Sequence, residues 1–161
     1  MRQRVCISEA LSTLTKLLIA DEPTTNLDVT IQDQILRRLD KLVQTRKTSI
    51  LLITHSLGVI KNLMERVCIM YAGNIVESAK TKDVFADPFH PYTIALLNTV
   101  PKLTGQGVSE GIQGRIPDYL NPPEGCRFHP RCNKAMPICR KERPPFFGVG
   151  NSHKVACFLY S

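Results

Sequence analysis

The chain has 161 residues, of which 43% are hydrophobic and 22% charged, a balance typical of a folded globular protein and not of a disordered one. Its apolar runs are much shorter than the roughly 20 residues of a transmembrane helix, and no signal peptide is visible after Met1, so the expected compartment is the cytoplasm. The net charge of +7 would suit nucleic acid or an anionic membrane surface.

Hydrophobic periodicity predicts alternating strands and helices in the first hundred residues. Strands are expected at 16–20, 49–54, 66–71 and 75–78, the last two joined as a hairpin. Helices are expected at 1–14, 29–43, 56–64, 81–86 and 92–99. Asp28 is the expected N-cap of the helix over 29–43. This order predicts an α/β fold with a largely parallel sheet.

Charge and proline content change near Pro101. From there onward the sequence has 9 Lys or Arg against 4 Asp or Glu, and it holds 8 of the 11 prolines. This shift indicates a basic, proline-rich segment attached to a more ordinary domain.

Polar side chains follow two of the expected strands where each strand ends. Asp21 and Glu22 come directly after the first strand, and His55 follows the second. Parallel sheets place ligands outside the carboxyl ends of their strands. A carboxylate there can hold Mg²⁺ while a second group orients an attacking water, as phosphoryl transfer requires. The competing interpretation is a solvated strand end, a helix cap and an ordinary loop histidine.

Several motifs in order resemble the ATPase of ABC transporters. "LLIADEP" is similar to the family's Walker B segment, "TTNLD" to its D-loop and "LLITHS" to its switch-histidine segment. "MRQRV" resembles the residues that follow the Ser-Gly-Gly of the signature motif, and "VCIMYAGNIVESA" the hairpin after the switch. The resemblance implies part of a P-loop NTPase sheet with flanking helices.

Roles follow from this resemblance residue by residue. Asp21 would help to hold the Mg²⁺ that accompanies ATP, and Glu22 would be the general base for the hydrolytic water. His55 would contact the γ-phosphate. Asp28 would lie in the D-loop and face a second ATPase subunit. These roles are expectations that the family implies.

The sequence contains no GxxxxGK[ST] phosphate loop. Without its backbone N–H groups and lysine, the acidic pair has no cradle for the nucleotide. We therefore expect a truncated ATP-binding subunit that is inactive by itself. An upstream ATPase half would then be a partner if the gene is split.

The second half of the chain narrows the resemblance. "DPFHPYTIALLNTVPKL" and "PPEGCRFHPRCNKAMPICR" are similar to the His-Pro-Tyr segment and the cysteine motif of the oligopeptide/dipeptide branch. The expected domains are 1–86, the ATPase part, and 87–161, a small cysteine-rich extension. The implied function is uptake of di- or oligopeptides with permease subunits at the cytoplasmic side of the cell membrane. Nickel stays open as a substrate. His90 and Tyr92 are expected to play a structural role.

Four cysteines lie in the basic segment with the spacing C-x5-C-x6-C-x17-C, namely Cys126, Cys132, Cys139 and Cys157. Disulfides are not expected in the cytoplasm. Zinc sites usually contain tight C-x2-4-C pairs, which are lacking here, whereas wider spacing suits a [4Fe–4S] cluster. The family resemblance points to the same cluster, and zinc is the second choice. His129 and His153 could replace one of the thiols.

A different class of function also fits the sequence. The chain could be a non-catalytic iron–sulfur or zinc module that binds a partner ATPase or permease. Binding of nucleic acid is not expected, because the basic segment lacks interleaved aromatic residues and any recognisable binding module.

Overall fold

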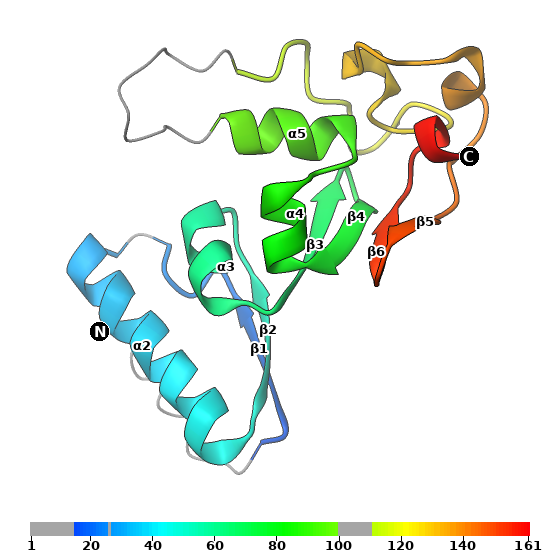
Figure 1. Ribbon diagram of the computed structural model, residues 1–161. Coiled ribbons are helices and arrows are strands. Elements are labelled where there is room, and N and C mark those ends of the chain that lie inside the picture. Colours follow the sequence, from blue (N-terminus) through cyan, green and yellow to red (C-terminus); the bar gives the residue numbers. More distant parts are fainter. Residues whose placement is uncertain (1–14, 26, 100–110) are drawn as a thin grey trace. The chain divides into compact units, whose positions relative to one another are not determined.

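A computed structural model describes residues 15–25, 27–99 and 111–161 of this chain (Figure 1). It separates into two compact units, Met1–Leu63 and Met64–Ser161. The helix expected over 1–14 lies outside the described residues. Over the described residues, no helix is both long enough and apolar enough to cross a membrane.

The first unit contains a two-stranded parallel sheet. Strand β1 (Leu17–Asp21) pairs with β2 (Ser49–Ile53) along its whole length, so that Asp21 lies opposite Ile53. The crossover between them contains α2 (Val29–Arg46), and α3 (Leu57–Leu63) follows β2. Parallel pairing of this kind needs a long connection, which the helix supplies.

Asp28 caps α2 as its sequence position predicted. Its side chain accepts a hydrogen bond of 2.9 Å from the backbone N–H of Ile31. The helix runs three residues beyond the expected end at Val43, because no glycine or proline interrupts it. It stops at Lys47, which adopts a left-handed conformation with φ of 52°.

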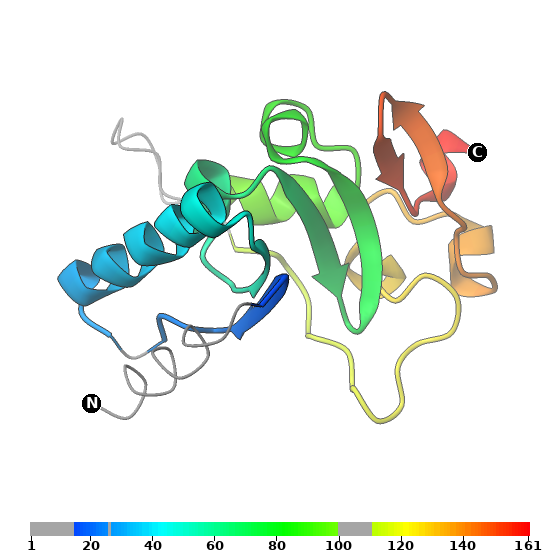
Figure 2. The same ribbon diagram turned by 90° about the horizontal axis from the view of Figure 1, so that it is seen from below.

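The sheet of the first unit has one covered and one open face. Ile35 and Leu39 of α2 are buried, and Figures 1 and 2 show this helix on one side of the strands. Strand residues alternate between the two faces, and the open one exposes large apolar side chains. These are Leu17, Ile19, Leu51 and Ile53.

The second unit is built on a four-stranded antiparallel sheet in the order β3-β4-β6-β5. Its strands are β3 (Arg66–Tyr71), β4 (Asn74–Lys80), β5 (Phe147–Gly150) and β6 (His153–Val155). The expectation of a largely parallel sheet is wrong for this unit. Ala72 and Gly73 have φ of 46° and 80°, and two successive left-handed residues turn the chain back as a tight hairpin.

The described residues of the second unit also form two helices and three short 3₁₀ turns. They are α4 (Thr81–Ala86), α5 (Pro91–Asn98), η1 (His129–Arg131), η2 (Pro137–Arg140) and η3 (Phe158–Tyr160). An aromatic cluster lies within the unit. Tyr71 packs on Tyr92 and Phe128 with ring centroids 4.6 and 5.1 Å away.

The described elements form a mixed α/β structure, as predicted, and most expected strands and helices appear within two residues of their predicted bounds. Strands β5 and β6 were not expected. They arise from the cysteine-rich segment, which returns to the hairpin and adds strands to it. The division into domains 1–86 and 87–161 remains a prediction.

Candidate functional site

The structure brings Glu22 and His55 together at the carboxyl ends of β1 and β2. One carboxylate oxygen of Glu22, Oε1, lies 2.8 Å from Nδ1 of His55 and accepts a 3.0 Å hydrogen bond from the backbone N–H of the same residue. The other oxygen, Oε2, accepts from the Thr25 hydroxyl at 2.9 Å. Three donor groups thus surround one carboxylate.

A backbone turn aims Glu22 at His55. The backbone N–H of Glu22 donates to the carbonyl of Ile53 at 2.9 Å, which extends the parallel pairing one step beyond β1. Glu22 then adopts φ of 45°, a left-handed conformation that is uncommon for residues other than glycine. Such strain is concentrated at functional sites, where surrounding contacts maintain it.

The same contacts set the charge of Glu22. The side-chain hydrogen bond to His55 lowers the pKa of the Glu22 carboxyl, the bond from Thr25 lowers it further, and partial desolvation opposes both. The carboxylate is therefore ionised throughout the neutral range. It can receive a hydrogen bond from water and orient it, but it holds a proton weakly.

Asp21 and Asp28 lie near this pair in the sequence but not in its hydrogen-bond network. Asp21 is the last residue of β1 and is exposed. Asp28 uses its side chain to cap α2. Their assigned roles toward Mg²⁺ and a second subunit remain predictions.

The second unit gathers the four cysteines around one small cavity. It is lined by Cys126, Cys132, Cys139 and Cys157, together with His90 and Phe128. All four thiols are free. Cys68 lies apart from them, exposed on β3, and Cys6 lies outside the described residues. The sequence spacing thus anticipated which cysteines come together.

Backbone N–H groups point at the sulfurs. For three of the four thiols, whose pKa burial raises, a backbone N–H two positions later in the chain offsets part of that rise. The pairs are Cys126 with Phe128, Cys132 with Lys134, and Cys157 with Leu159. The sulfur of Cys139 lies 3.5 Å from the backbone nitrogen of Met136. These contacts favour sulfur atoms that carry negative charge.

Burial and mutual repulsion act in the opposite direction. Burial raises the pKa of Cys126 and Cys132, and it raises the pKa of Cys157 to about 11, with repulsion from neighbouring thiolates adding to the effect. Metal ligation requires deprotonated thiols. A bound cation would remove the repulsion between these thiolates because its positive charge offsets theirs.

The sulfurs are nevertheless not arranged around a single ion. Within residues 15–25, 27–99 and 111–161, no group of three or more His, Cys, Asp or Glu side chains has the geometry to hold a metal ion. His153, a predicted substitute ligand, instead has Nε2 2.7 Å from Glu77. The Nδ1 of His129 lies 3.0 Å from the carbonyl oxygen of Cys126.

A tight loop positions the first cysteine. Gly125 has φ of +67°, and a Cβ atom there would lie only 2.4 Å from the carbonyl oxygen of Cys139. This close approach allows the N–H of Cys126 to donate to that oxygen at 2.9 Å. Arg127 donates to the carbonyl of Ala72 and so attaches the loop to the hairpin.

His90 plays the structural role that the sequence predicted. It is the N-cap of α5, and its Nδ1 accepts a 3.0 Å hydrogen bond from the backbone N–H of Tyr92. Desolvation lowers the pKa of His90 to about 4, although the nearby Glu77 carboxylate opposes the shift. The role of Glu77 is not visible in the sequence, since an acidic residue in a hairpin strand usually faces solvent.

Comparisons with known proteins match both halves of the chain. Residues 76–139 match the family described as "Oligopeptide/dipeptide transporter, C-terminal region". The chain is 50% identical over 161 residues to the oligopeptide transport ATP-binding protein AppD of Bacillus subtilis, covering 99% of this chain and 49% of the relative. It is 48% identical over 159 residues to OppD of Salmonella typhimurium, another oligopeptide transport ATP-binding protein, covering 98% and 47%.

A relative named for another peptide class gives a similar result. The dipeptide transport ATP-binding protein DppD of Haemophilus influenzae is 46% identical over 158 residues, covering 98% of this chain and 48% of its own length. The chain spans about half the length of the curated relatives it matches. These matches confirm the resemblance that the motifs indicated.

Proposed function

Since this chain is a relative of oligopeptide and dipeptide transport ATP-binding proteins along nearly its whole length, we propose that it contributes the hydrolytic half of an ATP site in a peptide ABC importer. The observation that supports this most directly is the contact between Glu22 and His55 at the carboxyl ends of two parallel strands. An acidic group and a histidine at this edge are suited to phosphoryl transfer.

In this proposal each residue has one task. Asp21 would help to hold Mg²⁺, which neutralises charge on the phosphates. Glu22 would orient the attacking water by accepting its hydrogen bond, and would receive its proton as the water oxygen bonds to the γ-phosphorus and the bond from that phosphorus to the departing ADP oxygen breaks. His55 is the contact to the γ-phosphate. Asp28, which caps α2, would lie in the D-loop and face a second ATP-binding subunit.

The proton on His55 restricts how this site works. A neutral imidazole has a single N–H, and if Nδ1–H donates to Glu22, Nε2 can only accept. To donate to a phosphate oxygen, His55 must either become imidazolium or release Glu22. A phosphate oxygen beside the ring would compete with Glu22 for the N–H of His55. Loss of the hydrogen bond between His55 and Glu22 would also leave one oxygen of Glu22 available to accept a hydrogen bond from water.

A phosphate-binding loop is also needed, and these 161 residues contain no GxxxxGK[ST] sequence. We propose that it comes from a further ATPase segment. The complete site would act with permease subunits at the cytoplasmic face of the membrane and drive uptake of di- or oligopeptides, with nickel as the alternative cargo. The names of the relatives favour this function over a non-catalytic metal module.

We propose that the four cysteines hold a [4Fe–4S] cluster, with zinc as the second choice. They line one cavity, and each sulfur lies near a backbone N–H. Among the described residues, no group of His, Cys, Asp or Glu side chains has the geometry of a single-ion site, so the preference for a cluster rests on the sequence spacing of the cysteines. The cluster would be structural, tying together a segment with little apolar core.

The hydrolytic assignment can be tested by joining this chain to the remaining half of the Bacillus subtilis relative. We expect phosphate release from Mg-ATP in the joined protein and none from the 161 residues alone. Glu22→Gln and His55→Ala should each reduce the rate by roughly 100-fold or more. Asp33→Asn is the matched control, since Asp33 is exposed on α2 and forms an ion pair with Arg37 of the same helix. Full activity after Glu22→Gln would overturn the assignment.

A further inference from the structure

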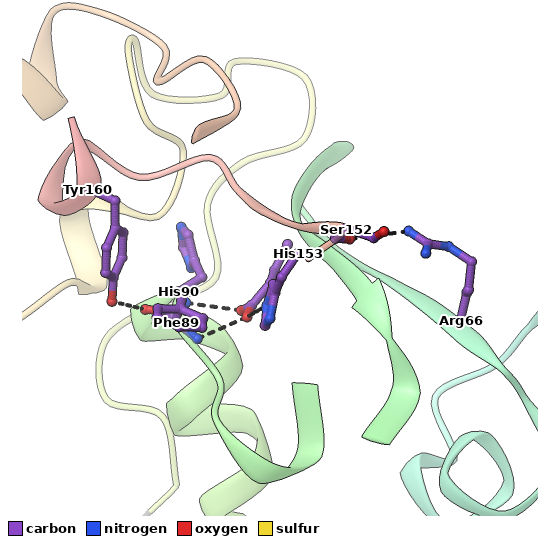
Figure 3. Close-up of polar contacts among 7 residues, drawn as sticks. Arg66, Phe89, His90, Ser152, His153 and Tyr160 are labelled. Atoms are coloured by element: carbon purple, nitrogen blue, oxygen red, sulfur yellow. Dashed lines mark hydrogen bonds and ion pairs between the residues drawn. The ribbon is translucent and has the colours of Figure 1, made fainter. Parts of the chain in front are cut away.

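A buried carboxylate joins three distant segments of the second unit. Glu77 of β4 is 0% exposed. Its Oε1 accepts from the backbone N–H of Phe89 at 2.9 Å and lies 2.7 Å from Nε2 of His153. Its Oε2 accepts from the backbone N–H of His90 at 3.0 Å. Figure 3 shows these contacts around Phe89, His90 and His153.

These contacts leave Glu77 little freedom. A buried carboxylate is tolerated only when charge and hydrogen-bonding capacity are both satisfied, and loss of one partner is costly. Here the partners come from the turn before α5 and from β6, which lies 76 residues away along the chain. The carboxylate therefore adds a side-chain contact to β6 beside the backbone pairing of β6 with β4.

The docking of β6 places Cys157. Glu77 and Val155 are paired residues of β4 and β6, and the backbone N–H of Ala156 donates to the carbonyl of Val76 at 2.8 Å. Cys157 is the next residue. Beyond it, the Tyr160 hydroxyl donates to the carbonyl of Phe89 at 2.9 Å (Figure 3). Cys157 thus lies between two hydrogen-bonded contacts, one to Val76 next to Glu77 and one to Phe89, whose backbone N–H binds Glu77.

The other three thiols are placed differently. Cys126, Cys132 and Cys139 lie in one loop, which closes on itself through the hydrogen bond from the N–H of Cys126 to the carbonyl of Cys139. Among the described contacts of Glu77, none involves this loop. The four-thiol cavity is therefore assembled from strand β6, which docks on β4, and from a loop that the Cys126–Cys139 hydrogen bond closes and Arg127 attaches to the hairpin.

We propose that Glu77 is the positioning residue of the four-thiol site, because it docks the strand that delivers Cys157 to the other three cysteines. Its carboxylate touches no sulfur and acts through His153 and the Phe89–His90 turn. The functional importance of this placement rests on the proposed metal site, but the placement of Cys157 itself can be measured without metal.

The first test measures alkylation of each cysteine in the full, metal-free chain by peptide mass spectrometry. In Glu77→Gln, the amide has only one acceptor oxygen and lacks the negative charge that the three donors face. We expect Cys157 to react roughly tenfold faster, which corresponds to about 1.4 kcal/mol easier local opening. Cys126, Cys132 and Cys139 should change less than about twofold.

Two further variants control this test. Glu142→Gln makes the same chemical change at an exposed residue next to the cysteine loop and should leave all four rates unchanged. Tyr160→Phe removes only the hydroxyl contact to Phe89 and should speed alkylation of Cys157 selectively, by a smaller factor. If Glu77→Gln does not fold, the test uses Tyr160→Phe, and the result is again read from whether Cys157 is alkylated faster while the other three cysteines are not. Equal acceleration of all four thiols, or no acceleration of Cys157, would overturn the proposal.

The second test measures iron and acid-labile sulfide after anaerobic reconstitution. Glu77→Gln should bind substantially less of both than the parent chain and Glu142→Gln do. Undiminished cluster content in folded Glu77→Gln would contradict the inference. If the parent chain binds neither iron nor zinc, the metal-site proposal fails, whereas the alkylation result still decides the placement of Cys157 by Glu77.

Discussion

Glu22 and His55 lie 33 residues apart in the sequence, yet Oε1 of one is 2.8 Å from Nδ1 of the other. The parallel pairing of β1 with β2 brings their carboxyl ends to the same edge of the sheet. The left-handed conformation of Glu22 then directs its side chain toward His55. The contact between Glu22 and His55 therefore depends on the strand pairing and on the turn at Glu22, and it can be tested separately from catalysis.

We expect His55→Ala to raise the pKa of the Glu22 carboxyl, because the side-chain hydrogen bond from His55 is the largest cause that lowers it. Thr25→Val should raise it by less, since the Thr25 bond is the second cause. Titration of the Glu22 carboxyl carbon by NMR measures both shifts. Asp33→Asn serves as the control on α2. An unchanged pKa in His55→Ala would show that the contact is not formed in solution.

The buried His90 should make the chain less stable in acid. Its pKa falls from 6.5 to about 4 on folding, so the unfolded chain takes up a proton below pH 6.5 that the folded chain accepts only near pH 4. Above pH 6.5 His90 is neutral in both states and does not lower the free energy of unfolding. As the pH falls from 6.5 to 4, protonation of the unfolded chain progressively lowers that free energy. The loss is about 3 kcal/mol by pH 4.

The matched variant for this prediction is His90→Asn, which keeps a good N-cap residue for α5 but does not titrate. Urea unfolding between pH 7 and pH 4 should give a smaller loss of unfolding free energy for His90→Asn than for the parent chain. Parallel pH dependences in the two proteins would contradict the role of His90.

Gly125 should be indispensable for the cysteine loop. Gly125→Ala introduces a Cβ atom 2.4 Å from the backbone oxygen of Cys139 at a φ of +67°. We expect a loss of stability of roughly 1–3 kcal/mol and faster alkylation of the loop cysteines. Gly148→Ala is the control, since nothing lies within 4 Å of a Cβ at Gly148. Thermal unfolding and alkylation compare the two, and equal behaviour would count against the close approach.

The thiol of Cys157 should be unreactive near neutral pH in the metal-free chain. Because its pKa is raised to about 11, only about one molecule in a thousand carries the thiolate at pH 8. The alkylation rate should therefore rise about tenfold per pH unit between pH 8 and pH 10. Exposed Cys68 provides the internal reference for reagent access. A rate that levels off below pH 9 would contradict the raised pKa.

Local features of this protein were predictable from short stretches of sequence. The hairpin of β3 and β4 was expected from two apolar runs joined at "AGN", and Asp28 was expected as an N-cap because it directly precedes an amphipathic helix. The placement of Asp21, Glu22 and His55 at strand ends followed from the same reasoning. Such features depend on neighbouring residues, whose spacing and backbone preferences are visible in the sequence.

Only the tertiary structure decided how distant segments meet. The sequence contained the four cysteines and Glu77, but not the docking of β6 on β4, which buries the carboxylate and brings Cys157 to the loop of the other three. Nor did it indicate that two further antiparallel strands, β6 and β5, extend the expected hairpin into a four-stranded sheet. Burial of Glu77 is favourable only once Phe89, His90 and His153 are all in place, and such cooperative contacts leave no periodic signal along the chain.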